Sequence, residues 1–513
     1  MKKQLVAVMD FGGQYSHMIV RRCRNLGVYA EMIPHTTAPD AIREMNPEAI
    51  ILSGGPSSVY AENAPVCDPE IFNLGIPVLG ICYGAQLIVR AMGGDVKQTK
   101  LREYGKTELL IDDTTDLFRG IEERTVVWMS HGDLIESLPA NFEIIAHTAG
   151  SPAAAFRKVG EGLVYGIQFH PEVVHTDKGE EILRNFLFSI CNCDATWSPE
   201  SFIDSAIAEI REVVGGGKVI CGLSGGIDSA TVAVLIHRAI QDRLTCIYVD
   251  NGLMRKRETG EIVRTFKKHF KINLEVVDAK DRFLERLRGI ADPEEKRKVI
   301  GDEFIRVFDE AATRIRDVDF LAQGTIYPDR VESAATSDLA SRIKSHHNVG
   351  ALPGGMRLRL IEPIRDLYKD EVRAVAKKLD LPENVVKRHP FPGPGLAARI
   401  IGEVTPDKLI ICRDAGAIVE EELRTAGFYD TTWQAFAVVG DDLATGVLGD
   451  ERSLGHIVII RAVESVEAMT ADFAKLPYDL LEKISSRITN EISGVTWVAY
   501  AISSKPPSTI EPC

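Results

Sequence analysis

Two segments of this chain pass from a short apolar stretch through a glycine-containing turn directly into a helical pattern. Residues 78–88 read VLGICYGAQLI, and residues 218–230 read KVICGLSGGIDSA. A direct passage from strand to helix is typical of folds in which helices alternate with the strands of a parallel sheet. Short β-branched runs alternate with helical patterns around both segments. This predicts an α/β protein with two doubly wound parallel-sheet domains.

Apolar β-branched runs mark the expected strands. Amphipathic patterns over 202–214 and 476–491 predict helices between them. The expected strands are 5–9, 49–52, 77–79, 126–129 and 164–168 in the first part of the chain, 218–223, 244–249, 274–277 and 319–322 in the second, and 435–439, 456–462 and 496–503 in the third.

Two local signals divide the chain into domains. A helix-start signal at Thr196-Trp-Ser-Pro199 places one boundary near 195. Three prolines and two glycines within His389-Pro-Phe-Pro-Gly-Pro-Gly395 prevent a regular element from crossing that segment. The strands and helix beyond it predict an α+β unit. We therefore expect three domains, at 1–195, 196–390 and 391–513.

Composition excludes several classes of protein. The 513 residues hold 45% hydrophobic and 26% charged side chains, which argues against wholesale disorder and a coiled coil. A formal net charge of −14 disfavours a broad nucleic-acid interface. The opening residues hold too few apolar side chains for a signal sequence, and the nine cysteines form no C-x-x-C pair. We expect a cytoplasmic enzyme with reduced thiols, no membrane span and no nucleic-acid partner.

Cys82 occupies the apex of the first turn. Gly80 and Gly84 flank it at the spacing of a nucleophile elbow, where a sharp turn leaves no room for side chains beside the nucleophile. The start of the following helix stabilises a thiolate, and the Tyr83 amide can help to bind an oxyanion. A buried structural cysteine is the alternative, but the paired glycines favour a nucleophile.

A nucleophilic thiol needs a base, and His170 is the favoured candidate. It ends an apolar run, and Glu172 follows it after a rigid proline, so the carboxylate can orient the ring. His131 in Ser130-His-Gly-Asp133 is the competing candidate. The turn Ser53-Gly-Gly-Pro56 also offers amides for an oxyanion hole, although an ordinary turn has the same composition.

Cys82, His170 and Glu172 resemble the triad of class I glutamine amidotransferases. The resemblance extends over residues 1 to about 190 and includes the opening Asp10-Phe-Gly-Gly-Gln14. It implies hydrolysis of glutamine through a thioester, with ammonia as the useful product, and it matches Gly55 to the oxyanion loop.

The second turn, Ser224-Gly225-Gly226-Ile227-Asp228-Ser229, has the composition of a phosphate site. Its backbone amides, two hydroxyls and helix start all favour a polyphosphate. The spacing of a Walker A loop is absent. An acid in such a loop repels phosphate, which makes Asp228 a candidate Mg²⁺ ligand. A plain turn is the alternative interpretation.

This loop is similar to the PP-loop of N-type ATP pyrophosphatases, which split ATP between the α and β phosphates. The resemblance implies ATP as co-substrate, bound at residues 224–229, and adenylylation of a carbonyl oxygen. Tyr248-Val-Asp250-Asn-Gly resembles a part of that fold near the nucleotide, although a helix-capping turn has the same residues.

A thiol that releases ammonia and a loop that activates an oxygen together specify an amination. The whole chain resembles the glutamine-hydrolysing GMP synthetase family, which converts XMP to GMP. The segments that carry this resemblance are 293–301, 321–329, 346–349, 360–365, 389–395 and 504–511.

The resemblance implies substrates, contacts and an assembly. It implies cleavage of ATP to AMP and pyrophosphate through an adenyl-XMP intermediate, and a homodimer formed by the last domain. Lys369 resembles a lid lysine, although pairing on a helix surface is an equal alternative. The implied contacts to XMP are Arg297, Gln434, Lys505 and Glu511.

Two departures and three rival functions accompany this interpretation. The chain ends Ile510-Glu-Pro-Cys513 where the family usually ends Ile-Glu-Trp-Glu, and Ala351 replaces a commoner glycine.

The rival functions are another glutamine-fed amide ligase, such as one that makes NAD, a PP-loop protein that modifies tRNA bases, and a catalytically silent glutamine sensor. The charge balance disfavours the second, and the intact motifs disfavour the third.

Overall fold

The computed structural model describes residues 4–56, 58–160, 162–330, 358–448, 451–465 and 470–513. The chain divides into two compact units, Met1–Ser201 and Phe202–Cys513. The motif predicted at 346–349 and the alanine at 351 lie outside the described residues. Within the described ranges, no helix is long and apolar enough to cross a membrane.

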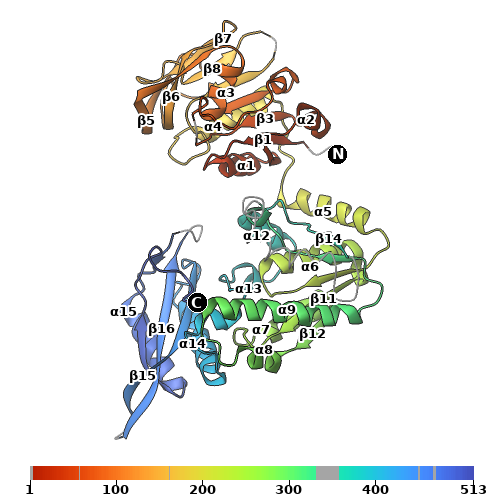
Figure 1. The fold of residues 1–513 in the computed structure, drawn as a ribbon, viewed down its shortest axis with the longest axis vertical. Coiled ribbons are helices and arrows are strands. Elements are labelled where there is room, and N and C mark those ends of the chain that lie inside the picture. The colour runs from red at the N-terminus through yellow and green to blue at the C-terminus, as the bar shows by residue number, and fades with distance from the viewer. Residues whose placement is uncertain (1–3, 57, 161, 331–357, 449–450, 466–469) are drawn as a thin grey trace. The chain divides into compact units, whose positions relative to one another are not determined.

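A mixed sheet forms the centre of the first unit (Figure 1). The strands described there follow the order β2-β1-β3-β4-β9-β8-β7-β5-β6. Neighbours from β2 to β9 are parallel, and those from β9 to β6 are antiparallel. The strands are β1 (Val6–Asp10), β2 (Ala30–Pro34), β3 (Ala49–Leu52), β4 (Val78–Ile81), β5 (Asp95–Ile111), β6 (Arg124–Ser137), β7 (Phe142–His147), β8 (Ala155–Lys158) and β9 (Val164–Ile167).

Helices accompany the parallel half of this sheet. Strands β3, β4 and β9 are buried at every position, as expected of strands covered on both faces. The α-helices of the unit are α1 (Ser16–Asn25), α2 (Pro39–Met45), α3 (Tyr83–Ala91) and α4 (Gly179–Arg184).

A parallel sheet with the order β12-β11-β10-β13-β14 begins the second unit. The first strand, β10, lies in the middle: β11 and β12 are added on one side of it, and β13 and β14 are then added on the other. Ligands of such sheets bind at this switch point, outside the carboxyl ends of the strands. The strands are β10 (Val219–Gly222), β11 (Leu244–Asp250), β12 (Asn273–Asp278), β13 (Phe320–Ala322) and β14 (Arg359–Ile361).

Helices connect and cover these strands. The polyphosphate loop predicted from the sequence joins β10 to α6, and it therefore lies at the switch point. The α-helices described in this part are α5 (Pro199–Val214), α6 (Ile227–Ile240), α7 (Glu258–Ile262), α8 (Lys280–Leu287), α9 (Pro293–Arg314), α12 (Lys369–Lys378) and α13 (Glu383–Val386).

A second sheet follows in the same unit. Strands β15 (Gln434–Leu448) and β16 (Glu451–Glu464) form a long antiparallel pair, and β16 also pairs with β17 (Asp472–Phe473) and β18 (Val495–Tyr500). Helices α14 (Pro406–Thr425) and α15 (Tyr478–Glu491) share a hydrophobic core with this sheet. The same core continues to Ile220 in the first sheet.

The α/β class and the α+β character of the C-terminal part agree with the sequence. The strand predicted at 49–52 has those bounds, whereas the one predicted to reach 503 ends at Tyr500. The sequence did not predict that half of the first sheet is antiparallel. β-Branched runs indicate where a strand lies but not its direction relative to its neighbours. The boundary near 390 stays a prediction, since the core of the second unit runs across it.

Gly84 is a test of how closely α3 approaches β3. A Cβ at this position would lie 2.5 Å from the Leu52 carbonyl oxygen, whereas a Cβ on Gly301 in α9 would meet nothing within 4 Å. We expect Gly84→Ala to cost about 1–3 kcal/mol of unfolding free energy and to lower the temperature of the first thermal unfolding transition. Gly301→Ala is the control and should leave that transition unchanged. Equal melting curves for both variants would contradict this packing.

Candidate active sites

Cys82 lies at the turn between β4 and α3, as the sequence predicts. Its backbone has a φ of 52° and a ψ of −105°, a combination that residues other than glycine rarely adopt. The Cys82 amide donates a hydrogen bond of 2.7 Å to the Ile167 carbonyl, which ties the turn to β9. The residue is 5% exposed. The strained turn holds the sulfur beside the first amides of α3, which have no partner within the helix.

His170 and Glu172 form a buried pair just beyond β9. The distance from His170 Nδ1 to Glu172 Oε1 is 2.7 Å, and both residues are buried. The backbone of the pair is also held. The His170 amide donates to the Trp128 carbonyl at 3.0 Å, and Arg22 Nε donates to the Glu172 carbonyl at 2.9 Å. The imidazole therefore has one fixed orientation.

The imidazole lies beside the Cys82 thiol. A Cβ on Gly54 would be 3.0 Å from His170 Cε1 and 3.9 Å from Cys82 Cβ, so both side chains border the same glycine. Burial alone lowers the pKa of His170, but the charge of Glu172 and the interaction with Cys82 outweigh burial and raise that pKa well above its usual range. Of the three residues predicted as a triad, His170 thus interacts with both Cys82 and Glu172.

His131 also has a carboxylate partner, which the sequence analysis missed. Glu103 on β5 lies directly opposite His131 on β6, and His131 Nε2 is 3.3 Å from Glu103 Oε2. Burial lowers the pKa of His131, while the Glu103 charge opposes this effect. The register between two strands places this acid, and a spacing of 28 residues gives no signal for it.

A cavity of about 320 Å³ opens beside the thiol. Both residues predicted for an oxyanion hole, Gly55 and Tyr83, line it together with Cys82. Gln86 Nε2 donates to the Asp133 carbonyl at 3.1 Å, which joins α3 to the opposite wall. The lining residues that the sequence did not single out as ligands include Gln86, Gln98, Tyr104, Ser130 and Asp133.

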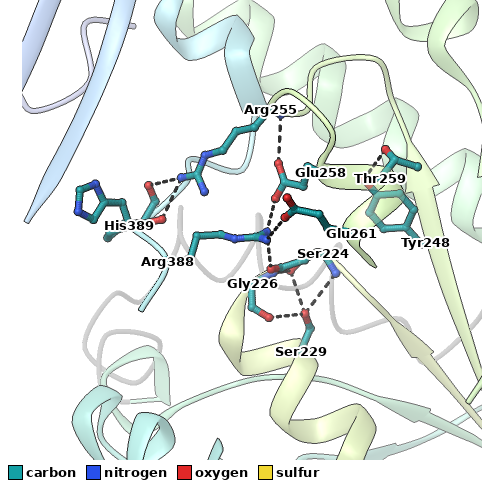
Figure 2. Close-up of polar contacts among 12 residues, drawn as sticks. Ser224, Gly226, Ser229, Tyr248, Arg255, Glu258, Thr259, Glu261, Arg388 and His389 are labelled. Atoms are coloured by element: carbon teal, nitrogen blue, oxygen red, sulfur yellow. Dashed lines mark hydrogen bonds and ion pairs between the residues drawn. The ribbon is translucent and has the colours of Figure 1, made fainter. Parts of the chain in front are cut away.

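The second predicted turn, 224–229, runs from β10 into α6. Its two hydroxyls meet, with Ser224 Oγ 3.0 Å from Ser229 Oγ, and Ser229 Oγ donates to the Gly226 carbonyl at 3.1 Å (Figure 2). The Ser224 amide donates to Ser229 Oγ at 3.2 Å. These bonds close the loop on itself, while its amides lie at the start of a helix of 14 residues.

Asp228 is paired across the chain with Lys369. Both carboxylate oxygens lie near Lys369 Nζ, at 2.6 and 2.8 Å. Lys369 is the first residue of α12 and contacts the loop through Asp228, while its role as a lid lysine stays a prediction. The described residues contain no group of three or more Asp, Glu, His or Cys side chains that could hold a metal ion by themselves.

The turn after β11 is held by two side chains that accept from backbone amides two residues further on. The Gly252 amide donates to Asp250 Oδ1 at 3.1 Å, and the Leu253 amide donates to Asn251 Oδ1 at 2.9 Å. Asp250 is buried and also accepts a hydrogen bond of 2.9 Å from Thr259 Oγ1. Its Oδ2 also lies 3.3 Å from Lys280 Nζ, and because α7 begins only at Glu258, this turn does not cap a helix, contrary to the alternative interpretation.

Two of the four residues predicted to contact XMP lie together. Gln434 Nε2 donates to Glu511 Oε1, and both oxygens of Glu511 also accept from Arg399, at 3.0 and 3.1 Å. Arg399 is buried, and nothing in its sequence context had marked it. Arg297 lies on α9, half-exposed and paired with Glu294.

The chain's last residues are also fixed in this region. Cys513 is buried, and its amide donates to the Ala398 carbonyl at 3.2 Å. Burial raises the pKa of the Cys513 thiol, and the nearby charges of Lys296 and Arg297 oppose the rise. The unusual final cysteine thus packs against the segment that carries Arg399, and Arg297 lies close to it.

Arg461 holds the segment around Lys505. This buried arginine on β16 donates to the carbonyl oxygens of Ser503 and Thr509, the latter at 3.2 Å. Lys505 itself forms a backbone bridge with Ala471. The tail is therefore held to the second sheet of the unit by the Arg461 side chain as well as by the backbone bridge of Lys505.

Family models match three parts of the chain. Residues 7–190 match glutamine amidotransferase class-I, residues 200–303 match NAD synthase, and residues 421–512 match the GMP synthase C terminal domain. The first match contains the triad and the second contains the loop 224–229. Together they define a class I amidotransferase region joined to a synthase region.

Similar proteins match over the whole length. A GMP synthase (glutamine-hydrolyzing) of Caldanaerobacter subterraneus is 53% identical over 510 residues, which are 99% of each chain. One of Synechococcus is 53% identical over 100% of this chain and 97% of its own, and one of Carboxydothermus hydrogenoformans is 55% identical over 99% of each. This chain belongs to the family of glutamine-hydrolyzing GMP synthases.

The His170 proton gives a direct test of the first site. The Glu172 charge raises the pKa of His170, so the imidazolium persists above the ordinary histidine range near pH 6.5. Because the folded-state pKa is raised, the pairing contributes stability that is complete below about pH 6.5 and is lost as the pH rises through the folded-state pKa.

We expect Glu172→Gln to shift the His170 titration to lower pH, because the substitution removes the carboxylate charge. NMR of ring-labelled histidine measures the midpoint, and the His170 signal is assigned by its absence in His170→Asn. An unchanged midpoint in Glu172→Gln would show that the carboxylate does not stabilise the imidazolium.

Proposed function

We propose that this chain transfers the amide nitrogen of glutamine to XMP and so makes GMP, with ATP cleaved to AMP and pyrophosphate through adenyl-XMP. The observation that carries the proposal is the presence of two complementary sites in one chain. One is the contact among Cys82, His170 and Glu172, and the other is the loop 224–229 at the switch point of a parallel sheet. The full-length likeness to GMP synthases supports XMP as the acceptor.

The glutamine reaction is assigned to the first site. Cys82 Sγ attacks the carboxamide carbon after its proton has passed to His170, and Glu172 maintains the orientation of the resulting imidazolium. The amides of Gly55 and Tyr83 donate to the oxyanion. The imidazolium then returns the proton to the departing nitrogen, which leaves as ammonia. Water releases glutamate from the thioester by the same steps.

The ATP reaction is assigned to the second unit. The amides and hydroxyls of 224–229 hold the polyphosphate, while an oxygen of XMP attacks the α-phosphorus and displaces pyrophosphate. Ammonia then replaces the adenylyl group, which leaves as AMP. Arg297 and Lys505 suit the charge of a nucleotide phosphate, and Glu511 and Gln434 suit the hydrogen-bonding groups of a purine or ribose.

Asp228 is proposed to hold Mg²⁺ together with phosphate oxygens. A single carboxylate beside a phosphate site fits this ion, which is usually bound by one or two carboxylates plus substrate phosphates. When bound, Mg²⁺ neutralises charge on the phosphates. Lys369, now paired with Asp228, is then available to the phosphate oxygens.

A homodimer through the C-terminal region is part of the proposal. Apolar side chains on three strands of the second sheet are half-exposed or more, which supports a contact with a second copy. They are Leu443 and Val447 on β15, Leu454 on β16 and Trp497 on β18.

An NAD-forming ligase is the alternative function to be compared with GMP formation. The match of residues 200–303 to NAD synthase fits either ligase, whereas the match at 421–512 favours GMP formation. Mass detection of GMP from XMP, ATP, Mg²⁺ and glutamine therefore tests the proposed function, and amination of another acid in its place would overturn it.

Cys82→Ala separates the two half-reactions. We expect glutamine-dependent GMP formation to fall by about 10³-fold or more, because the attacking sulfur is lost. Synthesis from added ammonium should continue near the unaltered rate, because the ATP site is intact. The measurement is GMP formed per minute with each nitrogen source. Loss of both activities in a folded variant would contradict two separable sites.

Asp228→Asn tests the ATP site. With ammonium as nitrogen source, we expect pyrophosphate release to fall on the order of a hundredfold and to require more Mg²⁺, because a charged ligand is lost. The matched control is Asp242→Asn, which alters an exposed acid beyond the other end of α6. Unchanged pyrophosphate release and Mg²⁺ dependence in Asp228→Asn would argue against metal binding there.

A further inference from the structure

Arg388 directly precedes the proline-rich segment 389–395, which the proposed reaction leaves without a role. Its side chain is 12% exposed. Figure 2 shows the guanidinium between the loop that carries Ser224 and Gly226 and two acids of α7. An arginine held beside a polyphosphate loop has the planar donors that phosphate oxygens prefer.

The segment after Arg388 is anchored by His389. The His389 ring stacks on Tyr429 with centroids 3.8 Å apart and an angle of 4° between the planes. The His389 amide donates to Tyr429 Oη at 3.1 Å, and the Ala435 amide donates to His389 Nδ1 at 3.2 Å. Nδ1 is therefore an acceptor, and Nε2–H donates to the Tyr429 carbonyl at 2.9 Å.

Arg255 anchors the same backbone from another side. Its Nη2 donates to the carbonyl oxygens of His389 and Pro390, at 2.9 and 3.1 Å. Pro390 also accepts from Gln434 Nε2 at 3.2 Å. The chain next to Arg388 is thus fixed by groups from three other segments, so the arginine side chain extends from a rigid base.

Arg388 divides its donors between two different acids. Its Nη1 lies 2.7 Å from Glu258 Oε1, and its Nη2 lies 3.1 Å from Glu261 Oε2. The Glu258 side chain is 4% exposed and that of Glu261 is 38% exposed. Losing the buried partner would leave an uncompensated charge, whereas the exposed partner can return to water. Glu258 is therefore the permanent partner and Glu261 the exchangeable one.

The guanidinium also reaches the loop itself. Arg388 Nη1 lies 3.5 Å from the Gly225 carbonyl oxygen. Gly225 has a φ of 81°, and a Cβ on it would be 2.8 Å from Ile262 Cδ1 and 3.3 Å from Glu258 Oε1. The loop therefore rests directly on α7. Arg388, Glu258 and Glu261 also line a cavity of about 570 Å³, whose other lining residues come from α14, α15 and the segments around them and not from the loop.

The charges on and around the loop 224–229 indicate a role for Arg388. Residues 224–229 contain one acid and no Lys or Arg, so the loop alone offers only neutral donors to a polyphosphate. Lys369 is paired with the acid on the loop, and Arg388 is another cation that contacts the loop in the described part of the chain. A ligand with several negative charges competes with an exposed carboxylate for such a cation.

We propose that Arg388 binds the polyphosphate of ATP, and the pyrophosphate formed from it, by keeping its bond to Glu258 and exchanging Glu261 for phosphate oxygens. The inference rests on the proposed function, which puts ATP on the loop 224–229. It also gives the segment 389–395 a role, because that segment fixes the backbone from which Arg388 extends.

The test compares two variants with opposite expected effects. Binding of Mg²⁺ with α,β-methylene-ATP, and of inorganic pyrophosphate, is measured by titration calorimetry on the full chain. We expect Arg388→Lys to weaken binding about tenfold, because the two-pronged contact is lost. This variant keeps a cation against buried Glu258, so it avoids an unpaired charge. Glu261→Gln should tighten binding by about threefold, because the competing carboxylate is removed.

Arg487→Lys is the matched control, since this arginine lines the same cavity but pairs with acids of α14 and α15. Its affinity for both probes should equal that of the unaltered chain. Unchanged binding in Arg388→Lys, or weaker binding in Glu261→Gln, would overturn the inference. Failure of the unaltered chain to bind either probe would overturn the proposed function itself. A purely structural Arg388 cannot produce opposite shifts in the two variants.

Discussion

The direct turn from a buried parallel strand into a helix determines where chemistry occurs in this chain. At β4–α3 the turn forces Cys82 into a backbone conformation with positive φ and brings its sulfur to the first amides of the helix. At β10–α6 the same kind of turn closes through the hydroxyls of Ser224 and Ser229. Both turns depend on a helix that approaches the sheet closely, and Gly84 is the position where that approach is tightest against β3.

Opposite charges from distant segments complete each site. His170 is held by Glu172, two residues away, but the other pairs join parts of the chain that are more than one hundred residues apart. Each pair holds a charged group in one orientation, and loss of a partner would leave an uncompensated charge on the buried members Glu258 and Arg399. These pairs are Lys369 with Asp228, Arg388 with Glu258, and Arg399 with Glu511.

Local patterns predicted the framework and the motifs well, because strands, glycine turns and helix starts are encoded by neighbouring residues. The buried strand at 49–52 and the position of Cys82 are examples. Glu103 was missed because strand register alone places it opposite His131. Arg399 was missed because its partner Glu511 comes from the far end of the chain. A single sequence shows which residues are charged, but not which of them meet in the fold.

Arg461 couples the conformation of the C-terminal tail to strand β16. One buried guanidinium on β16 gathers acceptors from Ala501, Ser503, Ser508 and Thr509. The tail forms little secondary structure of its own, so its conformation depends on these hydrogen bonds to the sheet. Loosening of β16 would free the segment around Lys505 from Arg461, whereas Glu511 would keep its ion pair with Arg399. The nucleotide contact proposed at Lys505 therefore shares the cooperativity of the sheet instead of fraying independently.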